Sequence, residues 1–505
     1  MRNIKVGLNK FSLLLGKRGF YVFVLGLFVV ESLWIALSAV YPQAFDENFH
    51  FGLIKIYSHY WLPFLTRQPP NAGAYGAVAH DPSYLYHYLM SFPYRLISLV
   101  FHGQVAQVIC LRIIDIGLFL LGLHLFKKVL VRVGLSKNLA NVSLLIFILI
   151  PIVPQLAAQI SYDDLLFPLV AWIILQAFDL TEPIKKHKAS TKRLFILAIT
   201  ILLTGIEKYA SLPISLAVII YVVWLFYKAY RPNLKSIWLD LKKDFTRLSP
   251  KLRLLLVVGL LISLGMFLER DGYNIVFYHR VEPDCAKVLS VKECKPYSAW
   301  YASYARHEDL LKGKTHITYD PISYTGQWFY WMWYRLFFAV NGPNSNFASY
   351  SPLPVPSLVA IAVALIGGLA LIVWRKLVFK NNPFAVLLLL VVLIYCTALF
   401  VQGYITYNYT AVLENMNGRY LIPILLPLAG LLGLALSRGL HRWHWTKALL
   451  SLVVIVLFFE GGGTLTFILR SDNSWYWDNG AIEKINDDVR KVIKHVVIHP
   501  HHKKD

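Results

Sequence analysis

Continuous apolar blocks alternate with short polar connections along the 505 residues of the chain. Each block is about 20 residues long, which as a helix crosses roughly 30 Å of hydrocarbon. The blocks are continuous and do not alternate residue by residue, so they predict helices and not the strands of a barrel. We expect an all-α polytopic membrane protein with about eleven spans, at residues 19–41, 106–127, 138–156, 164–180, 194–207, 210–229, 254–270, 355–374, 384–402, 420–437 and 448–468.

Every second connection between these blocks is basic. Examples are the segments 127–137, 185–193, 228–253, 375–380 and 438–447. The positive-inside rule then predicts an N-terminus in the cytoplasm, and we expect a bacterial plasma membrane. This bias also accounts for the net charge of +22, so the charge does not indicate nucleic-acid binding. The 57% hydrophobic content and a mean hydropathy of +0.53 agree with a membrane protein.

The opposite, extracytoplasmic face carries two large predicted loops, 42–105 and 271–353. Each contains an aromatic segment, SYLYHYLMSFPYRLISLVF and YTGQWFYWMWYRLFF, that we expect to lie in the membrane interface. The second loop holds Cys285 and Cys294, which are close enough in sequence to pair. We therefore predict one transmembrane domain over residues 1–470 and an extracytoplasmic tail over 471–505, part of which is patterned as an amphipathic helix.

Two acidic pairs fall on the extracytoplasmic side. Asp46 and Glu47 follow the first span in AFDENFHFG, which also contains His50, and Asp163 and Asp164 open the fourth span in SYDDLLF. Acids are ordinary choices at helix ends, since the helix dipole favours them there. Two such pairs at the ends of different spans are also the arrangement that would frame one site.

Charged residues also lie within or at the ends of spans. Arg112 and Asp115 are three residues apart and share a helix face, so they form either a structural pair or part of a site. Lys208 and Arg419 lie on the extracytoplasmic side, against the positive-inside bias. Each either binds an anion or extends its charged end to the interface.

Acids and cations around an extracytoplasmic cavity suit glycosyl transfer from a lipid-linked sugar phosphate. The acceptor hydroxyl must lose a proton as it attacks the sugar, which calls for a carboxylate base. The departing phosphate calls for Lys or Arg. The lipid tail calls for a groove that opens to the bilayer.

The same segments resemble the GT-C glycosyltransferases, in particular the protein O-mannosyltransferase and aminoarabinose transferase group. The resemblance rests on FDENFHF, DPSYLYHYL, CLRIIDIGLFLLGLHLFKKVL, SYDDLLFPLVAWIILQ, TGIEKYASLPISL and GRYLIPILLPL. It covers about the first 220 residues in order and the rest more loosely. The chain departs from the group where Asp81, Pro82 and Ser83 replace a double proline, and where the large C-terminal domain of some members is absent.

The resemblance implies a GT-C-type bundle with extracytoplasmic interface helices and assigns roles to residues. Asp46 would be the catalytic base, with Glu47 beside it, and Asp163 or Asp164 the second acid. Lys208 and Arg419 would meet the donor phosphate. His50, Tyr86 and Arg112 complete the predicted substrate-binding set. No metal ligand is assigned, and a divalent metal ion stays open.

We therefore expect an inverting glycosyltransferase that builds a cell-envelope glycan. Its partners would be a polyprenyl-phosphate sugar donor, a glycan, lipid or protein acceptor, and the bilayer, without nucleic acid. The alternatives are a transporter or flippase for a lipid-linked sugar and a catalytically inactive GT-C scaffold, since a motif is not an activity.

Overall fold

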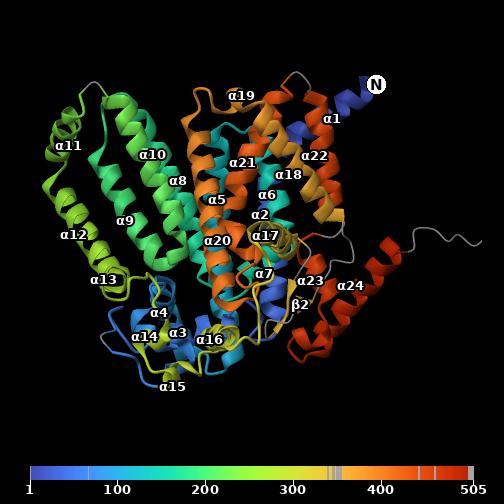
Figure 1. Ribbon diagram of the computed structural model, residues 1–505. Helices are drawn as coiled ribbons and strands as arrows, with labels where there is room; N and C mark the ends of the chain where they lie inside the picture. The colour runs from blue at the N-terminus through green and yellow to red at the C-terminus, as the bar shows by residue number, and fades with distance from the viewer. Residues whose placement is uncertain are drawn as a thin grey trace, which may run out of the picture.

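The structure is a computed structural model that describes residues 2–65, 67–231, 233–337, 340–343, 347–348, 355–441, 444–459 and 462–498. Parts of the predicted loop 271–353 and the last residues of the predicted tail, 499–505, lie outside the described residues. The described chain is a helical bundle with short helices across both of its ends (Figure 1).

Eight stretches of the described chain are long and apolar enough to cross a membrane, which makes this an integral multi-pass membrane protein. Their main helices are α2 (Arg18–Ser38), α5 (Gln104–Val133), α8 (Asp163–Lys185), α10 (Leu212–Tyr230), α12 (Pro250–Phe267), α20 (Pro383–Thr410), α21 (Ile422–Gly439) and α22 (His444–Phe459). Three further predicted spans correspond to α6 (Lys137–Ile148), α9 (Thr191–Glu207) and α18 (Val355–Val373), which are not among these eight stretches. Every predicted block is helical, but length alone does not confirm eleven crossings.

Two predicted spans are interrupted, in both cases at residues that disfavour a continuous helix. The span 138–156 divides into α6 and α7 (Ile152–Ala157), with Pro151 between them, because proline lacks the N–H that continues a helix. The span 448–468 divides into α22 and α23 (Thr464–Arg470), with Gly463 before α23 at a φ of +60°.

The upper end in Figure 1 carries the basic connections, and we call it the basic end. The helices there are α1 (Arg2–Leu15), α11 (Lys235–Arg247) and α19 (Arg375–Phe379). The opposite end, which we call the site end, carries α3 (Glu47–Tyr57), α4 (Leu85–Val100) and the short turns η1 (Gly73–Tyr75), η2 (Val78–His80), η3 (Tyr209–Ser211) and η6 (Gly418–Leu421). The two ends of the bundle are therefore chemically different.

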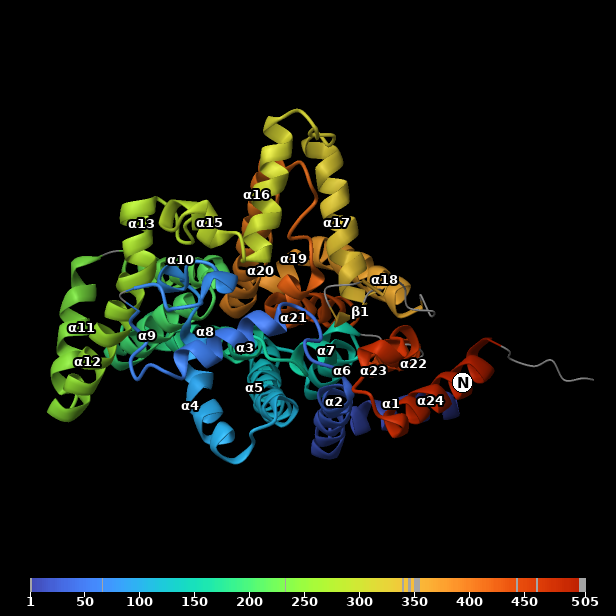
Figure 2. The same ribbon diagram turned by 90° about the horizontal axis from the view of Figure 1, so that it is seen from below.

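The two predicted interface segments are helical and run across the bundle axis. In Figure 2 α2 and α5 are seen nearly down their axes, whereas α4, α16 (Ser298–Leu311) and α17 (Pro321–Phe337) are seen from the side. α16 and α17 form a hairpin that extends sideways from the bundle. The aromatic segment in α17 thus lies in the orientation expected of an interface helix.

The remaining elements connect these parts. α12 continues through a π-helical turn, η4 (Leu268–Gly272), into α13 (Tyr273–Tyr278), and α14 (Cys285–Val288) and α15 (Val291–Cys294) are joined by a disulfide between Cys285 and Cys294. A two-stranded antiparallel sheet pairs β1 (Val340–Asn341) with β2 (Phe347–Ala348). After α23 the chain forms η7 (Asn473–Trp475) and α24 (Gly480–Ile498), which covers the tail segment expected to be helical.

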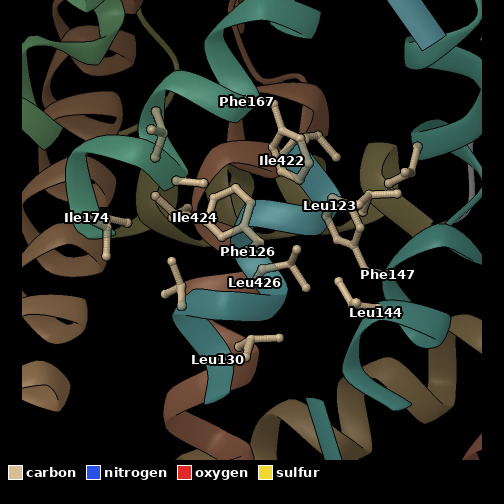
Figure 3. Close-up of a cluster of buried hydrophobic side chains, with 14 of the residues drawn as sticks. Leu123, Phe126, Leu130, Leu144, Phe147, Phe167, Ile174, Ile422, Ile424 and Leu426 are labelled. Atoms are coloured by element: carbon tan, nitrogen blue, oxygen red, sulfur yellow. The ribbon is translucent and has the colours of Figure 1, made fainter. Parts of the chain in front are cut away.

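The core of the bundle lies between α5, α6, α8 and α21 (Figure 3). The Phe167 ring lies 4.3 Å from that of Phe119, 4.7 Å from Phe126 and 5.5 Å from Phe147, measured between centroids. A side chain at Gly122 would place its Cβ 2.3 Å from the Phe167 ring, so this position requires glycine. This aromatic layer packs α5 closely against α8, the two helices that carry Arg112 and Asp163 to the site end.

Candidate functional site

The site is built around a reversal of the chain just after α2. Phe45 and Asp46 both adopt left-handed backbone conformations, with φ of 51° and 67°, before α3 begins at Glu47. Consecutive non-glycine residues with positive φ are uncommon and gather at functional sites. The turn directs two neighbouring acids into different surroundings. The Asp46 side chain is 55% exposed, whereas Glu47 is only 1% exposed.

Asp46 is held by a cation from the far end of the sequence. Its Oδ2 lies 3.1 Å from Nη2 of Arg419, although the two residues are 373 positions apart. Asn417 anchors the backbone of Arg419 by accepting its N–H, and the guanidinium lies 5.2 Å from the ring centroid of Tyr420. The pair joins the start of α3 to η6 at the start of α21.

A second acid–cation pair lies beside the first. Lys208 Nζ lies 2.5 Å from Oδ1 of Asp163, at the N-terminus of α8. The same ammonium lies 4.1 Å from the ring centroid of Tyr162 and 5.4 Å from that of Tyr420. Because Lys208 and Arg419 share the ring of Tyr420, both pairs belong to one cluster.

Two neutral histidines form the next side of this cluster. Nδ1 of His50 lies 2.9 Å from Nε2 of His87, and the His50 ring meets that of Tyr162 edge-on at 4.5 Å. Burial lowers the pKa of His87 to about 3. Burial also lowers the pKa of His50 well below its ordinary value, with His87 and the nearby Arg419 and Lys208 adding to the effect. Both rings are therefore uncharged near neutral pH.

Glu47 belongs to a different, fully enclosed structure. Its two carboxylate oxygens accept bonds from Nε and Nη2 of Arg112, both at 2.8 Å. Glu47 also accepts the backbone N–H of Gln43 and of Ile160, and Arg112 donates to carbonyls near the end of α2. The Glu47 carboxylate and the Arg112 guanidinium thus both have hydrogen-bond partners, as a buried ion pair requires. Arg112 and Asp115 share a helix face as expected, but Arg112 pairs with Glu47 and not with Asp115, which a short-range rule within one helix does not predict.

Three enclosed carboxyl groups lie beneath the two acid–cation pairs. Asp115 accepts the hydroxyl of Tyr86 at 2.8 Å, whereas neither oxygen of Asp164 nor of Glu207 has a hydrogen-bond partner within the described residues. All three side chains are fully enclosed. Tyr86 and Asp164 thus lie under the site and not on its open side.

The outer wall of the site comes from the disulfide-bonded loop. Tyr297 stacks on Phe49 with centroids 5.7 Å apart, and it leaves no room for a side chain at Gly76, whose φ is +70°. Glu282 is exposed on this loop near Tyr209. These residues add aromatic and acidic groups that the sequence patterns did not single out.

An apolar groove of about 680 Å³ lies one helix away, between α17 and α18. It is lined by Phe329, Tyr330, Trp333, Tyr334, Ile361, Ala364 and Leu365. α17 also packs against η6, so closely that a Cβ at Gly418 would lie 2.5 Å from the backbone nitrogen of Leu336. α17 therefore contacts both the groove and the turn that carries Arg419.

The predicted site residues thus divide into three groups. Asp46, His50, Asp163, Lys208 and Arg419 converge, Glu47 and Arg112 form the enclosed pair, and Tyr86 and Asp164 lie beneath. Sequence reasoning missed His87 and Glu207, although each adjoins or lies within a segment that it had selected, DPSYLYHYL and TGIEKY.

The arrangement does not fit a divalent metal ion. Within the described residues, no three His, Cys, Asp or Glu side chains gather as ligands for one ion. The two outer acids are each engaged by a basic side chain, which occupies the position that a cation would take. We derive no step that depends on a metal.

No protein-family model matches the chain, and no curated protein matches it. Among solved structures, it is similar to the archaeal oligosaccharyltransferase AglB from Archaeoglobus fulgidus in complex with an inhibitory peptide and a dolichol-phosphate, at 14% identity and a TM-score of 0.43, over 93% of this chain and 59% of that one. The A. fulgidus oligosaccharyltransferase tethered with an acceptor peptide containing the NVT sequon is 12% identical with a TM-score of 0.43, over 94% and 59%. The same enzyme in complex with Zn and sulfate is 14% identical with a TM-score of 0.41, over 92% and 57%.

The chain spans about three fifths of the length of these structures. At this identity and TM-score the likeness does not indicate an activity.

Proposed function

We propose that this protein is an inverting GT-C-type glycosyltransferase that moves a sugar from a polyprenyl-phosphate donor to an acceptor on the extracytoplasmic face. The observation that carries the proposal is the pairing of Asp46 with Arg419 next to that of Asp163 with Lys208. One centre then offers an accessible carboxylate and two cations, which are the groups that this reaction needs.

In this mechanism Asp46 is the base. Its carboxylate takes the proton of the acceptor hydroxyl while the oxygen forms a bond to C1 of the donor sugar. The bond between C1 and the phosphate oxygen breaks, and the phosphate leaves with the electron pair. Arg419 and Lys208 stabilise the growing negative charge on that phosphate, so the donor must compete with Asp46 and Asp163 for these cations.

Other residues position the reactants. The neutral His50, fixed by its hydrogen bond to His87, is assigned to orient the acceptor beside Asp46. Asp163 holds Lys208 in place. Glu47 and Arg112 act as a structural anchor for the start of α3, and Tyr86 and Asp164 support the site from below.

The donor lipid is assigned to the groove between α17 and α18. The groove is apolar and its aromatic lining is partly exposed, with Phe329, Tyr330 and Leu365 among the exposed side chains. A polyprenyl chain is also apolar, so burying it there is favourable in proportion to the area removed from water. α17 would then contact both the tail and the turn that carries Arg419.

Transport is the weaker alternative. A transporter needs access from both ends of the bundle, whereas the charged cluster lies at one end and the apolar core drawn in Figure 3 packs between α5, α6, α8 and α21. The enzyme needs access only from the site end.

The decisive experiment replaces the base. Asp46→Asn keeps the size of the side chain and removes its ability to accept the proton, so we expect transfer from a labelled polyprenyl-phosphate sugar to fall by about 10²–10⁴-fold. The measurement is single-turnover transfer in proteoliposomes. The matched control is Glu308→Gln on α16, a half-buried acid at the same end that pairs with Lys312, which should leave transfer unchanged. Turnover retained by a folded Asp46→Asn protein would remove the assignment.

A further inference from the structure

A second cavity lies nearer the basic end, away from the acid–cation cluster. It measures about 550 Å³ and lies between α5 and α8, beside Tyr21 of α2. Its lining is Tyr21, His124, Leu125, Lys127, Lys128, Val131, Arg132, Trp172, Leu175, Gln176 and Asp179. The proposed reaction uses none of these residues.

The cavity changes from apolar to charged along the helix axis. On α8 the lining begins at Trp172, which is 47% exposed, and ends at Asp179 seven residues later. At 1.5 Å per residue this is about 10 Å, comparable with the step from acyl chains to the headgroup of a phospholipid. On α5 the lining residues recur at spacings of three and four, so they share one face.

The charged end of the cavity is basic. Asp179 is the acidic side chain in the lining, and Arg132 neutralises it at 2.7 Å. Lys127 is held with its Nζ 3.1 Å from the ring centroid of Tyr21, whose hydroxyl in turn contacts His124 Nδ1 at 3.0 Å. Lys128 is exposed at the rim. Lys127 and Lys128 are thus available to bind an anion, and Lys127 is held in a fixed position.

We propose that this cavity binds an anionic phospholipid, with the phosphodiester at Lys127 and Lys128 and an acyl chain against Trp172. Basic pockets between membrane helices on the basic side are suited to acidic lipid headgroups. The apolar end favours a lipid over a soluble phosphate, because exposed side chains such as Leu121 continue the surface of α5 towards its middle.

The test measures lipid binding by the full-length protein in neutral detergent. We expect phosphatidylglycerol to raise the melting temperature, and to be retained in native mass spectra, more than phosphatidylcholine. In Lys127→Gln/Lys128→Gln the affinity for phosphatidylglycerol should fall about 30-fold. The control, Lys242→Gln/Lys243→Gln on the equally basic α11, should keep it.

Three results would overturn the proposal. They are equal stabilisation by the two lipids, full retention of phosphatidylglycerol by the cavity variant, and equal protection by inorganic phosphate, which would indicate a soluble anion. Should the double variant misfold, Lys128→Gln and Trp172→Ala provide the same comparison, since both side chains are exposed. Transfer activity is not part of the readout, so failure here leaves the proposed function untouched.

Discussion

Two adjacent acids, Asp46 and Glu47, end up in opposite surroundings. Asp46 is accessible and has one basic partner, whereas Glu47 is enclosed and accepts four hydrogen bonds. The left-handed backbone at Asp46 and the start of α3 at Glu47 produce the difference. An acid with spare lone pairs and access to solvent is suited to chemistry, while one with every lone pair used is suited to holding helices together.

The enclosed pair of Glu47 and Arg112 should affect stability more than any other contact in this comparison. Arg112→Met leaves Glu47 as an unpaired buried charge, so we expect a loss of about 3–5 kcal/mol of unfolding free energy. Thermal unfolding in detergent measures this. The double variant Glu47→Leu/Arg112→Met should recover most of the loss, because it removes both charges together.

A matched control for this prediction is Lys312→Met, which breaks an exposed ion pair with Glu308. It should leave the melting temperature nearly unchanged. A melting temperature for Arg112→Met equal to that of the wild type would show that the pair is not an anchor.

The two acid–cation pairs of the site should affect turnover of the donor. Lys208→Met and Arg419→Lys remove or reshape a charge assigned to the donor phosphate, and we expect kcat/KM for the donor to fall about 10–100-fold. The KM for the acceptor should stay within about twofold, because the acceptor does not contact these cations in the proposed mechanism. A loss confined to the acceptor KM would contradict the phosphate assignment.

The histidine pair makes stability depend on pH. The pKa of His87 is about 3 when folded and near 6.5 when unfolded, so the unfolded state binds more protons below pH 6.5. Stability is therefore lost as the pH falls from about 6.5 towards 3, by roughly 1–2 kcal/mol for this histidine between pH 7 and pH 5. His87→Gln should reduce the dependence of the melting temperature on pH over that interval, and an unchanged slope would show that the pKa of His87 does not shift on folding.

The smallest effect concerns the outer wall. The disulfide-bonded loop carries Tyr297 onto Phe49. Cys285→Ser/Cys294→Ser should loosen that contact and raise the acceptor KM several-fold, with kcat nearly unchanged. Cys110→Ser, a free cysteine of α5, is the control. An unaltered acceptor KM would show that the loop does not contribute to acceptor binding.

Much of the fold was predictable because its main signal is local. An apolar block of about 20 residues specifies a helix without knowledge of its neighbours. The break at Pro151 is also a local signal, but the continuous apolar run around it favoured a single span. The number of membrane crossings cannot be predicted from local sequence alone, since it depends on how helices such as α6 and α9 lie in the bilayer.

The site was predictable as a set of residues but not as a set of partners. Asp46, Lys208 and Arg419 stand out as charges at the ends of spans, yet the pairing of residues 46 and 419 depends on the packing of η6. The enclosed contacts of Arg112 were likewise hidden, because its nearest acid in sequence is Asp115. Glu282 gave no signal at all, since it lies in a polar loop without a motif.

The aromatic layer around Phe167 has a consequence for the cell as a whole. Enclosed carboxyl groups such as Asp164 could otherwise recruit water and conduct protons down the electrochemical gradient. Phe119, Phe126 and Phe147 pack against Phe167 and oppose such a leak between α5, α6 and α8. If the proposed reaction takes place at the site end, a proton released there stays at that end, and the protein can work in an energised membrane without discharging it.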